Sequence, residues 1–106
     1  MADIDNNFAA LAIRDTNSHT SGITDTGEFN AQTIAIKNGL DQQVTLQFQG
    51  SLDKTTWFDV GDSFAIAATT NDYQTVTDYF PCYRMTAVCT TAPTTGALDA
   101  WILKTR

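Results

Sequence analysis

QVTLQFQGSLDKTTWFDVG, residues 43–61, is the segment that decides the predicted fold. In its first half Val44, Leu46 and Phe48 alternate with polar Gln and Thr side chains. Strict alternation of apolar and polar residues is typical of a β-strand with one face buried and the other in water. The segment therefore predicts a strand whose Val44, Leu46 and Phe48 side chains enter a hydrophobic core.

The second half of this segment predicts a hairpin, with a turn over residues 51–56 and a return strand that starts at Trp57. Because alternate side chains of a strand point to opposite faces, Phe58 and Val60 are predicted to enter the core, while Trp57 and Asp59 share the other face. An exposed Trp57 would suit a platform on which sugars stack, and a half-buried Trp57 would suit a cap or an interface. The place of Trp57 at the end of the hairpin favours the half-buried side chain.

The rest of the chain repeats this strand pattern. Thr is abundant and Glu28 is the only Glu, a composition that favours strands over helices. Residues 38–42 are predicted to join two strands as a hairpin, with Asn38 and Gly39 at positive φ. Further strands are predicted in TIAIKN (33–38), SFAIA (63–67), YQTVT (73–77), CYRMTAVCT (82–90) and ALDAWILK (97–104).

Seven or eight short strands at intervals of about 8–12 residues favour an all-β fold, an antiparallel β-sandwich of the jelly-roll or immunoglobulin-like type. A chain of 106 residues suits one domain with a single core. That core is predicted to contain Ile34, Ile36, Val44, Leu46, Phe48, Phe58, Phe64, Tyr83, Met85 and Leu98.

Residues 1–30 differ from the rest, because they are acidic and include the polar run DTNSHTSGITDTGE. They predict an irregular N-terminal arm, followed by the β-sandwich domain at 31–106. An arm of this composition has little apolar surface of its own to bury. Phe8, Leu11 and Ile13 are therefore predicted to anchor it on a partner.

The last predicted strand indicates a second interface. Asp99 should not be buried without a partner, so its face is placed outward. By alternation Trp101 and Leu103 share that outward face, while Leu98, Ala100 and Ile102 point inward. A large aromatic and an aliphatic side chain on an outer face predict a contact with another molecule.

Charge and cysteine spacing exclude several classes of function. The net charge is −6 and the six Lys and Arg residues are scattered, so no nucleic-acid partner is expected.

The N-terminal sequence lacks the basic and apolar regions of a secretory signal, and no long apolar run predicts a membrane span. Cys82 and Cys89 lie on opposite faces of one strand, about 23 Å apart, so no disulfide is expected. Synthesis and folding in a reducing cytoplasm are predicted.

No pattern of catalytic or metal-binding residues stands out. His19, the only His, lies in a polar loop without a nucleophile motif, and two Cys with one His are too few for a closed zinc site. The Asp residues flank strand ends, where Asp stabilises turns. The oxygen-rich segments at 3–7 and 59–62 lack the spacing of an EF-hand calcium loop. The chain is predicted to have no catalytic residue, no metal and no cofactor.

Residues 50–103 carry a family resemblance. SLDKTTW (51–57) resembles the Ser-x-Asp-Gly-Thr-x-Trp hairpin of small β-sandwich proteins in tailed-bacteriophage virions. CYR (82–84) is similar to their Tyr-x-Arg strand, and APTTG (92–96) to their last hairpin. Lys54, where Gly is usual, predicts a less strained turn, and Cys82 replaces a common aromatic residue. Discoidin-like carbohydrate-binding sandwiches share parts of this pattern, but they are longer and often closed by disulfides.

The resemblance implies a virion accessory protein, most specifically a capsid decoration (cement) protein that stabilises the assembled head. Its implied partners are the major capsid protein and further copies of itself, as a homotrimer near a capsid three-fold axis. Its implied location is the virion. The alternative is a module of a tail or fibre that binds carbohydrate or a host receptor; an enzyme is not expected.

Overall fold

The computed structural model describes residues 2–26, 31–76 and 80–105 and has ten strands in two antiparallel sheets. The strands are β1 (Ala2–Leu11), β2 (His19–Thr20), β3 (Thr24–Asp25), β4 (Ala31–Asn38), β5 (Val44–Ser51), β6 (Trp57–Asp59), β7 (Phe64–Ile66), β8 (Thr70–Val76), β9 (Cys82–Val88) and β10 (Leu98–Thr105). The described residues contain no helix that is long and apolar enough to cross a membrane.

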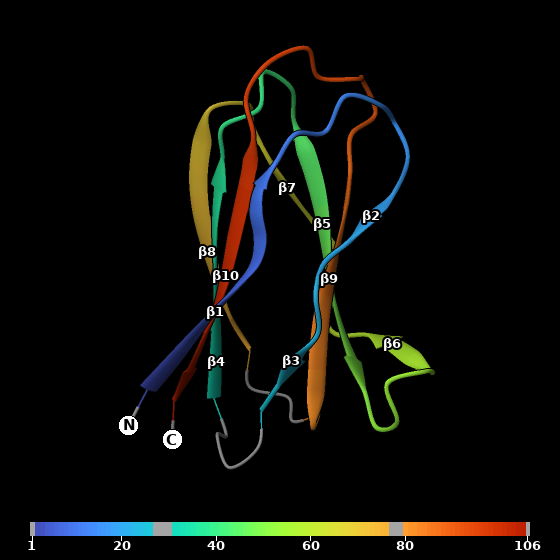
Figure 1. Cartoon of the computed structure of the whole chain (residues 1–106), viewed down its shortest axis with the longest axis vertical. Helices are drawn as coiled ribbons and strands as arrows, with labels where there is room; N and C mark the ends of the chain where they lie inside the picture. Colours follow the sequence, from blue (N-terminus) through green and yellow to red (C-terminus); the bar gives the residue numbers. More distant parts are fainter. Residues whose placement is uncertain (1, 27–30, 77–79, 106) are drawn as a thin grey trace.

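The two sheets face each other as the layers of a sandwich (Figure 1). Sheet A has the strand order β1-β10-β4-β8. Sheet B has the order β2-β9-β5-β6, with β3 also pairing with β9 and β7 with β5. The prediction of an all-β antiparallel sandwich is confirmed, and the structure adds short strands that the pattern did not predict.

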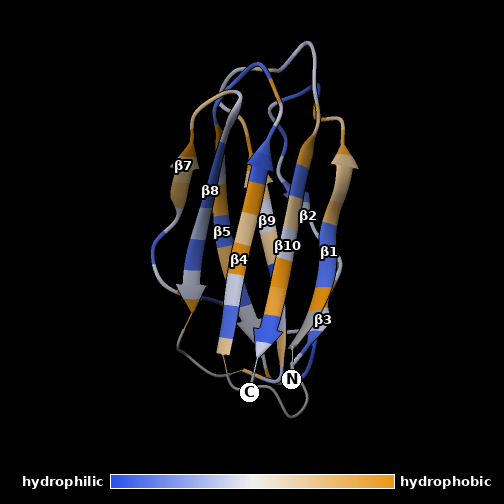
Figure 2. Ribbon diagram, turned by 90° about the vertical axis from the view of Figure 1, so that its left-hand side faces the viewer, coloured by the Kyte–Doolittle hydropathy of each residue, from blue (hydrophilic) through white to orange (hydrophobic). Residues whose placement is uncertain are grey.

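Alternation along the long strands builds the core. In β4 and β10 every second side chain is buried, and hydrophobic and hydrophilic bands alternate along both strands in Figure 2. Eight of the ten predicted core residues are buried: Ile34, Ile36, Val44, Leu46, Phe48, Tyr83, Met85 and Leu98. Phe64 packs against the core while partly buried, and the placement of Phe58 in the core is wrong, because 48% of its surface is exposed.

Phe58 has the predicted facing but lies at the open end of the sandwich. It is paired with Gly50 of β5, two residues beyond the buried Phe48. Its ring lies 6.2 Å from that of Phe80, which contacts Tyr83 at 6.0 Å. Phe58 is thus the outermost member of an aromatic row that begins at Phe48 and Tyr83, whose ring centroids are 4.6 Å apart.

The predicted hairpin at residues 38–42 is a connection between the two sheets instead. β4 pairs with β10 and β8 in sheet A, whereas β5 pairs in sheet B. The Asn38 amide donates to the carbonyl oxygens of Gln42, Ile66 and Ala67, and its Oδ1 accepts from Leu40 N–H. These bonds stabilise an arch rather than a two-stranded turn, because each goes to a residue across the sandwich or in the arch itself.

The N-terminal segment is part of the sandwich and not a separate arm, which corrects the predicted boundary at residue 30. β1 is an edge strand of sheet A and pairs with β10 from Ala2↔Thr105 to Leu11↔Leu98. The chain then crosses to sheet B, where β2 and β3 both pair with β9. The segment folds in this way because Phe8 and Ile13 complete the core.

Candidate interaction surface

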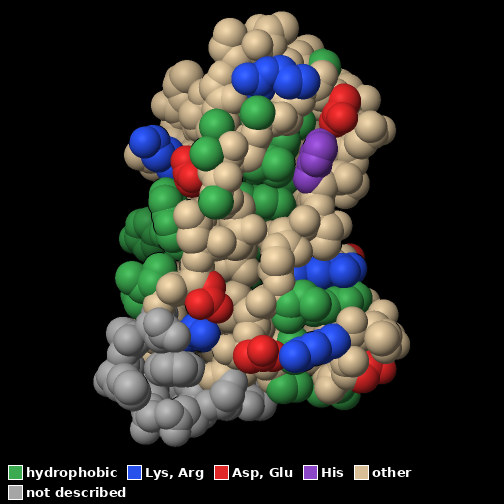
Figure 3. All heavy atoms as spheres, in the orientation of Figure 1, with side chains coloured by type: hydrophobic (Ala, Val, Ile, Leu, Met, Phe, Trp, Pro, Cys, Tyr) green, Lys and Arg blue, Asp and Glu red, His purple; other side chains and the backbone are tan. Residues whose placement is uncertain are grey.

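The outer face of sheet A carries a cluster of apolar side chains. Strand register aligns Trp101 with Ala35 and Ala35 with Tyr73, and aligns Leu103 with Ile4. We call Ile4, Ala35, Tyr73, Trp101 and Leu103 the apolar surface. Ile4 and Tyr73 are 62% and 69% exposed, and Trp101 and Leu103 are half-buried. Figure 3 shows hydrophobic side chains gathered at the left edge, where sheet A lies in Figure 1.

Two shallow depressions cover this surface, and Trp101 and Ala35 line both of them. One, of about 370 Å³, is completed by Ile4, Thr33 and Leu103. The other, of about 360 Å³, extends towards Tyr73 and the polar ends of β4 and β8. Their shared wall places Trp101 at the centre of the apolar surface, which is where interface anchors concentrate.

The predicted interface residues divide into two groups. Trp101 and Leu103 point outward, as the alternation around Asp99 predicted. Asp99 has a partner, because its Oδ1 accepts the backbone N–H of Ala10 at 2.8 Å. Phe8 and Ile13 are wrong as partner anchors, since both are buried in the core, and Leu11 packs against that core.

Ile4 and Tyr73 belong to the apolar surface and were missed by the sequence reasoning. Ile4 lies in the segment for which the sequence predicts an arm. Tyr73 lies in a strand whose side chains are almost all polar, so the sequence pattern does not predict which of them point outward. The aromatic side chain at the start of YQTVT was the one available signal.

Trp57 lies on the outer face of sheet B, half-buried as predicted. The Arg84 guanidinium lies over its ring, 4.2 Å from the ring centroid. Arg84 Nε donates to Gln49 Oε1 at 2.8 Å, and Gln49 Nε2 donates to Asp59 Oδ1 at 3.0 Å. The result is a polar row beside one aromatic ring, with one face of that ring already covered.

The turn that leads to Trp57 is held by its own side chains. Asp53 Oδ1 accepts the backbone N–H groups of Thr56 at 2.8 Å and Thr55 at 2.9 Å, and Ser51 Oγ accepts that of Lys54. The Thr56 and Thr55 bonds hold the pKa of Asp53 far below its usual range. Lys54 has φ of 66°, so the prediction of a less strained turn is wrong: Lys54 adopts the left-handed backbone that Gly would adopt at lower cost.

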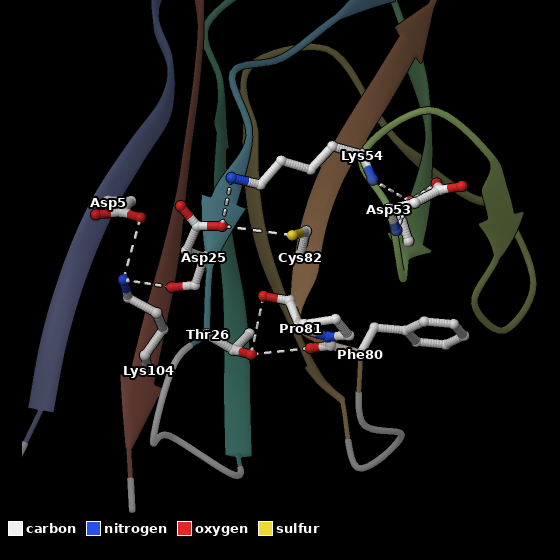
Figure 4. Close-up of polar contacts among 10 residues, drawn as sticks. Asp5, Asp25, Thr26, Asp53, Lys54, Phe80, Pro81, Cys82 and Lys104 are labelled. Atoms are coloured by element: carbon white, nitrogen blue, oxygen red, sulfur yellow. Dashed lines mark hydrogen bonds and ion pairs between the residues drawn. The ribbon is translucent and has the colours of Figure 1, made fainter.

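Polar contacts connect the two sheets at the end of the sandwich where the chain termini lie (Figure 4). Lys104 of β10, whose side chain is 7% exposed, donates to Asp5 Oδ2 at 3.3 Å and to the Asp25 carbonyl oxygen at 3.1 Å. The Asp25 carboxylate pairs with Lys54 at 3.1 Å and accepts from Cys82 Sγ at 3.4 Å. The Lys54 contact lowers the pKa of Asp25, and burial raises the pKa of the Cys82 thiol.

The remaining candidates for chemistry lie apart from one another. His19 lies in β2 and not in a loop, and its Nε2 is 2.9 Å from Oδ1 of Asp15 in the segment before that strand. Cys82 and Cys89 are both free and buried. Within residues 2–26, 31–76 and 80–105, no three His, Cys, Asp or Glu side chains gather closely enough to hold a metal ion.

Comparison with solved structures finds the same fold in several proteins. The PBSX exported protein XepA matches with a TM-score of 0.72 at 18% identity, over 99% of this chain and 37% of that one. The SPBc2 prophage-derived protein YomS matches with a TM-score of 0.68 at 11% identity, over 98% and 92%. A subunit of Bacillus endospore appendages, described as disulfide-linked pili, matches with a TM-score of 0.60 at 17% identity, over 99% and 87%.

This chain thus spans little more than a third of XepA and nearly all of YomS. The likeness confirms the resemblance in fold to β-sandwich proteins of phage origin. No protein-family model matches the sequence, and no curated protein matches it significantly.

Proposed function

We propose that this chain is a structural protein of a bacteriophage virion, and specifically a decoration (cement) protein that binds the assembled head. The observation that carries the proposal is the apolar surface of sheet A, which has Trp101 at its centre and Ile4 and Tyr73 exposed at its margins. A protein that binds only the assembled shell stabilises that shell by mass action, without chemistry of its own. We therefore infer that it is not an enzyme.

Two further observations support this choice. XepA and YomS, which share the fold, carry names that connect them to the PBSX and SPBc2 prophages. The two buried free thiols suit synthesis in a reducing host cytoplasm, followed by residence in the virion. The partner proposed for the apolar surface is the major capsid protein.

A second candidate function rests on the polar row beside Trp57. An aromatic ring flanked by an amide, a carboxylate and a guanidinium is a combination that binds sugars, which would suit a tail or fibre module. Arg84 already covers one face of that ring, so only the other face remains for stacking. This arrangement favours the decoration function over the sugar-binding one.

The test compares Trp101→Ala with Trp57→Ala. Phage heads prepared without this chain are mixed with each purified variant, and sedimentation measures how much protein binds. We expect saturable binding of the unaltered chain, a higher melting temperature of the decorated heads, and binding weakened by about tenfold or more in Trp101→Ala. Trp57→Ala is the matched control and should bind normally.

The same two variants on a glycan array address the alternative. One outcome is that the unaltered chain does not bind heads but binds a glycan, and that Trp57→Ala loses the glycan binding. That outcome would overturn the decoration proposal in favour of the sugar-binding module. If Trp101→Ala binds heads as well as the unaltered chain does, the apolar surface is not the part of the protein that binds them.

A further inference from the structure

β8 is a long, regular strand at an open edge of sheet A. It pairs with β4 on one side, from Gln32↔Val76 to Asn38↔Thr70 without a break in register, and no described strand pairs with its other side. The opposite edge, β1, is interrupted by two register shifts and by Ala10 at φ of 49°. In sheet B the described strands β2, β3, β6 and β7 are two or three residues long. Among the described strands, β8 is therefore the one edge with room for a further strand.

The composition of β8 does little to prevent such pairing. Natural edge strands are commonly protected by Lys, Pro or bulges. β8, TNDYQTV, has none of these, and its six residues from Thr70 to Thr75 are all exposed. Its one charged residue, Asp72, accepts the backbone N–H of Tyr73 at 2.7 Å, so that N–H is directed away from β4, and an added strand would take the place of the Asp72 carboxylate as its acceptor. Because backbone groups alternate between the two edges of a strand, those of Asn71 and Thr75 face the same open side.

A groove runs beside this edge, between the two sheets. It has a volume of about 170 Å³. Ile34, Phe48 and Val60, which are buried core residues, form part of its lining, and Gln74 and Thr75 contribute the β8 side. A strand added to β8 would direct every second side chain towards this groove, because side chains of a strand alternate between faces. A single extended ligand would therefore contact the open backbone of β8 and the groove at the same time.

We propose that β8 accepts an extended segment of another protein as a fifth strand of sheet A, with an apolar side chain in the groove and Lys or Arg on either side of it. Backbone hydrogen bonds supply affinity in this mode of recognition, and side-chain pockets supply specificity. The basic residues follow from Asp62, which lines the groove, and Asp72, which lies on the strand. Assigning the segment to the phage shell rests on the proposed function, whereas the strand-accepting edge does not.

A second copy of β8 fits this edge less well. In an antiparallel pair centred on Tyr73, the Asp72 of one copy would lie opposite Gln74 of the other, beside the groove that Asp62 lines. Two carboxylates would then approach each other where the net charge of the chain is already −6. The charges favour a basic partner over self-pairing.

The probe is a capped heptapeptide that alternates Thr with Lys, Val and Lys, so that Val and both Lys share one face. Titration into the isotope-labelled chain is followed by the backbone amide NMR signals. We expect saturable shifts centred on Asn71, Tyr73 and Thr75. In an antiparallel pair the Thr residues lie opposite Asn71, Tyr73 and Thr75, and their N–H groups point to β8. The same peptide with the amides of its third and fifth residues N-methylated should therefore bind at least tenfold more weakly, because methylation removes these hydrogen-bond donors. Equal binding of the two peptides, shifts centred on Trp101, or no binding would overturn the proposal.

Thr75→Pro provides the test on the protein side. It removes one outward N–H at an edge position where Pro is tolerated, while Thr75→Val keeps that N–H and a similar shape. We expect the Pro variant to lose peptide binding and the Val variant to keep it, at equal melting temperatures. Shifts of the same three amides with protein concentration alone would show self-pairing and overturn the choice of partner. Heads that bind Thr75→Pro normally but not Trp101→Ala would refute strand addition on the shell and leave the decoration function intact.

Discussion

The ring of Phe80 lies directly over Gly50, so that a Cβ on Gly50 would stand 2.5 Å from two of the ring carbons. Gly50 is paired with Tyr83 on one side and with Phe58 on the other, and the missing side chain gives Phe80 its place in the aromatic row. The requirement for glycine at this position is steric, because Gly50 is not at positive φ.

Gly50→Ala should therefore destabilise the protein by about 1–3 kcal/mol, the usual cost of overfilling a packed site. Chemical denaturation measures the change. Gly22→Ala is the matched control, because nothing lies within 4 Å of its Cβ position, and it should stay within about 0.5 kcal/mol. Equal stability of Gly50→Ala and the unaltered chain would show that Phe80 does not occupy this place.

Phe8→Ala tests whether the N-terminal segment belongs to the sandwich. Phe8 is 4% exposed, and removing a buried Phe ring typically costs about 3–5 kcal/mol. Ile4→Ala in the same strand should cost less than about 1 kcal/mol, because Ile4 is 62% exposed. If both variants unfold at the same denaturant concentration as the unaltered chain, residues 2–11 are an arm after all.

The Asp53 turn should make the protein sensitive to acid. A carboxyl whose pKa is lowered by folding adds stability above its ordinary pKa of 3.8, and that stability is lost as the pH falls towards the lower folded pKa. Asp53→Asn can accept the same Thr55 and Thr56 bonds without titrating. Its melting temperature should therefore fall less steeply below pH 4 than that of the unaltered chain.

Asp62→Asn serves as the control for Asp53→Asn, because it removes the same charge from another exposed position. It should keep the slope of the unaltered chain. Parallel curves for all three proteins would mean that the Asp53 hydrogen bonds do not contribute to stability.

Lys54 should be more easily replaced by Gly than by Ala. Both substitutions remove the ion pair with Asp25, but only Ala retains the cost of a side chain at φ of 66°. Thermal melting should therefore place Lys54→Gly a few degrees above Lys54→Ala. The reverse order would imply that the left-handed backbone at this turn carries no strain.

The homotrimer stays a prediction, and it concerns the same apolar surface. Association through Trp101 and Leu103 would give a particle of about three times 11.6 kDa, with these side chains near the centre of its interfaces. Light scattering at micromolar concentrations measures the mass, and Trp101→Ala should then be monomeric. A monomeric unaltered chain would contradict the homotrimer, and the apolar surface would then be available to bind the capsid shell.

By itself, the sequence determined the facing of side chains along β4, β5, β9 and β10. Val44, Leu46 and Phe48 enter the core and Trp101 points outward, because alternation is a local property of extended backbone. The hairpin pattern also predicted that Trp57 is half-buried and that Asp53 stabilises a turn. The Asp53 bonds reach only Thr55 and Thr56, whereas Arg84, which covers the Trp57 ring, is distant in sequence.

Tertiary structure decided which strands lie side by side. Asn38 and Gly39 suggested a hairpin, but bonds from Asn38 to Ile66 and Ala67 made the segment an arch between sheets. Polar β1 joins sheet A because Phe8, far from β10 in sequence, completes a core that residues 31–106 leave open. The apolar surface and the open edge of β8 follow from that strand order, which no local pattern contains.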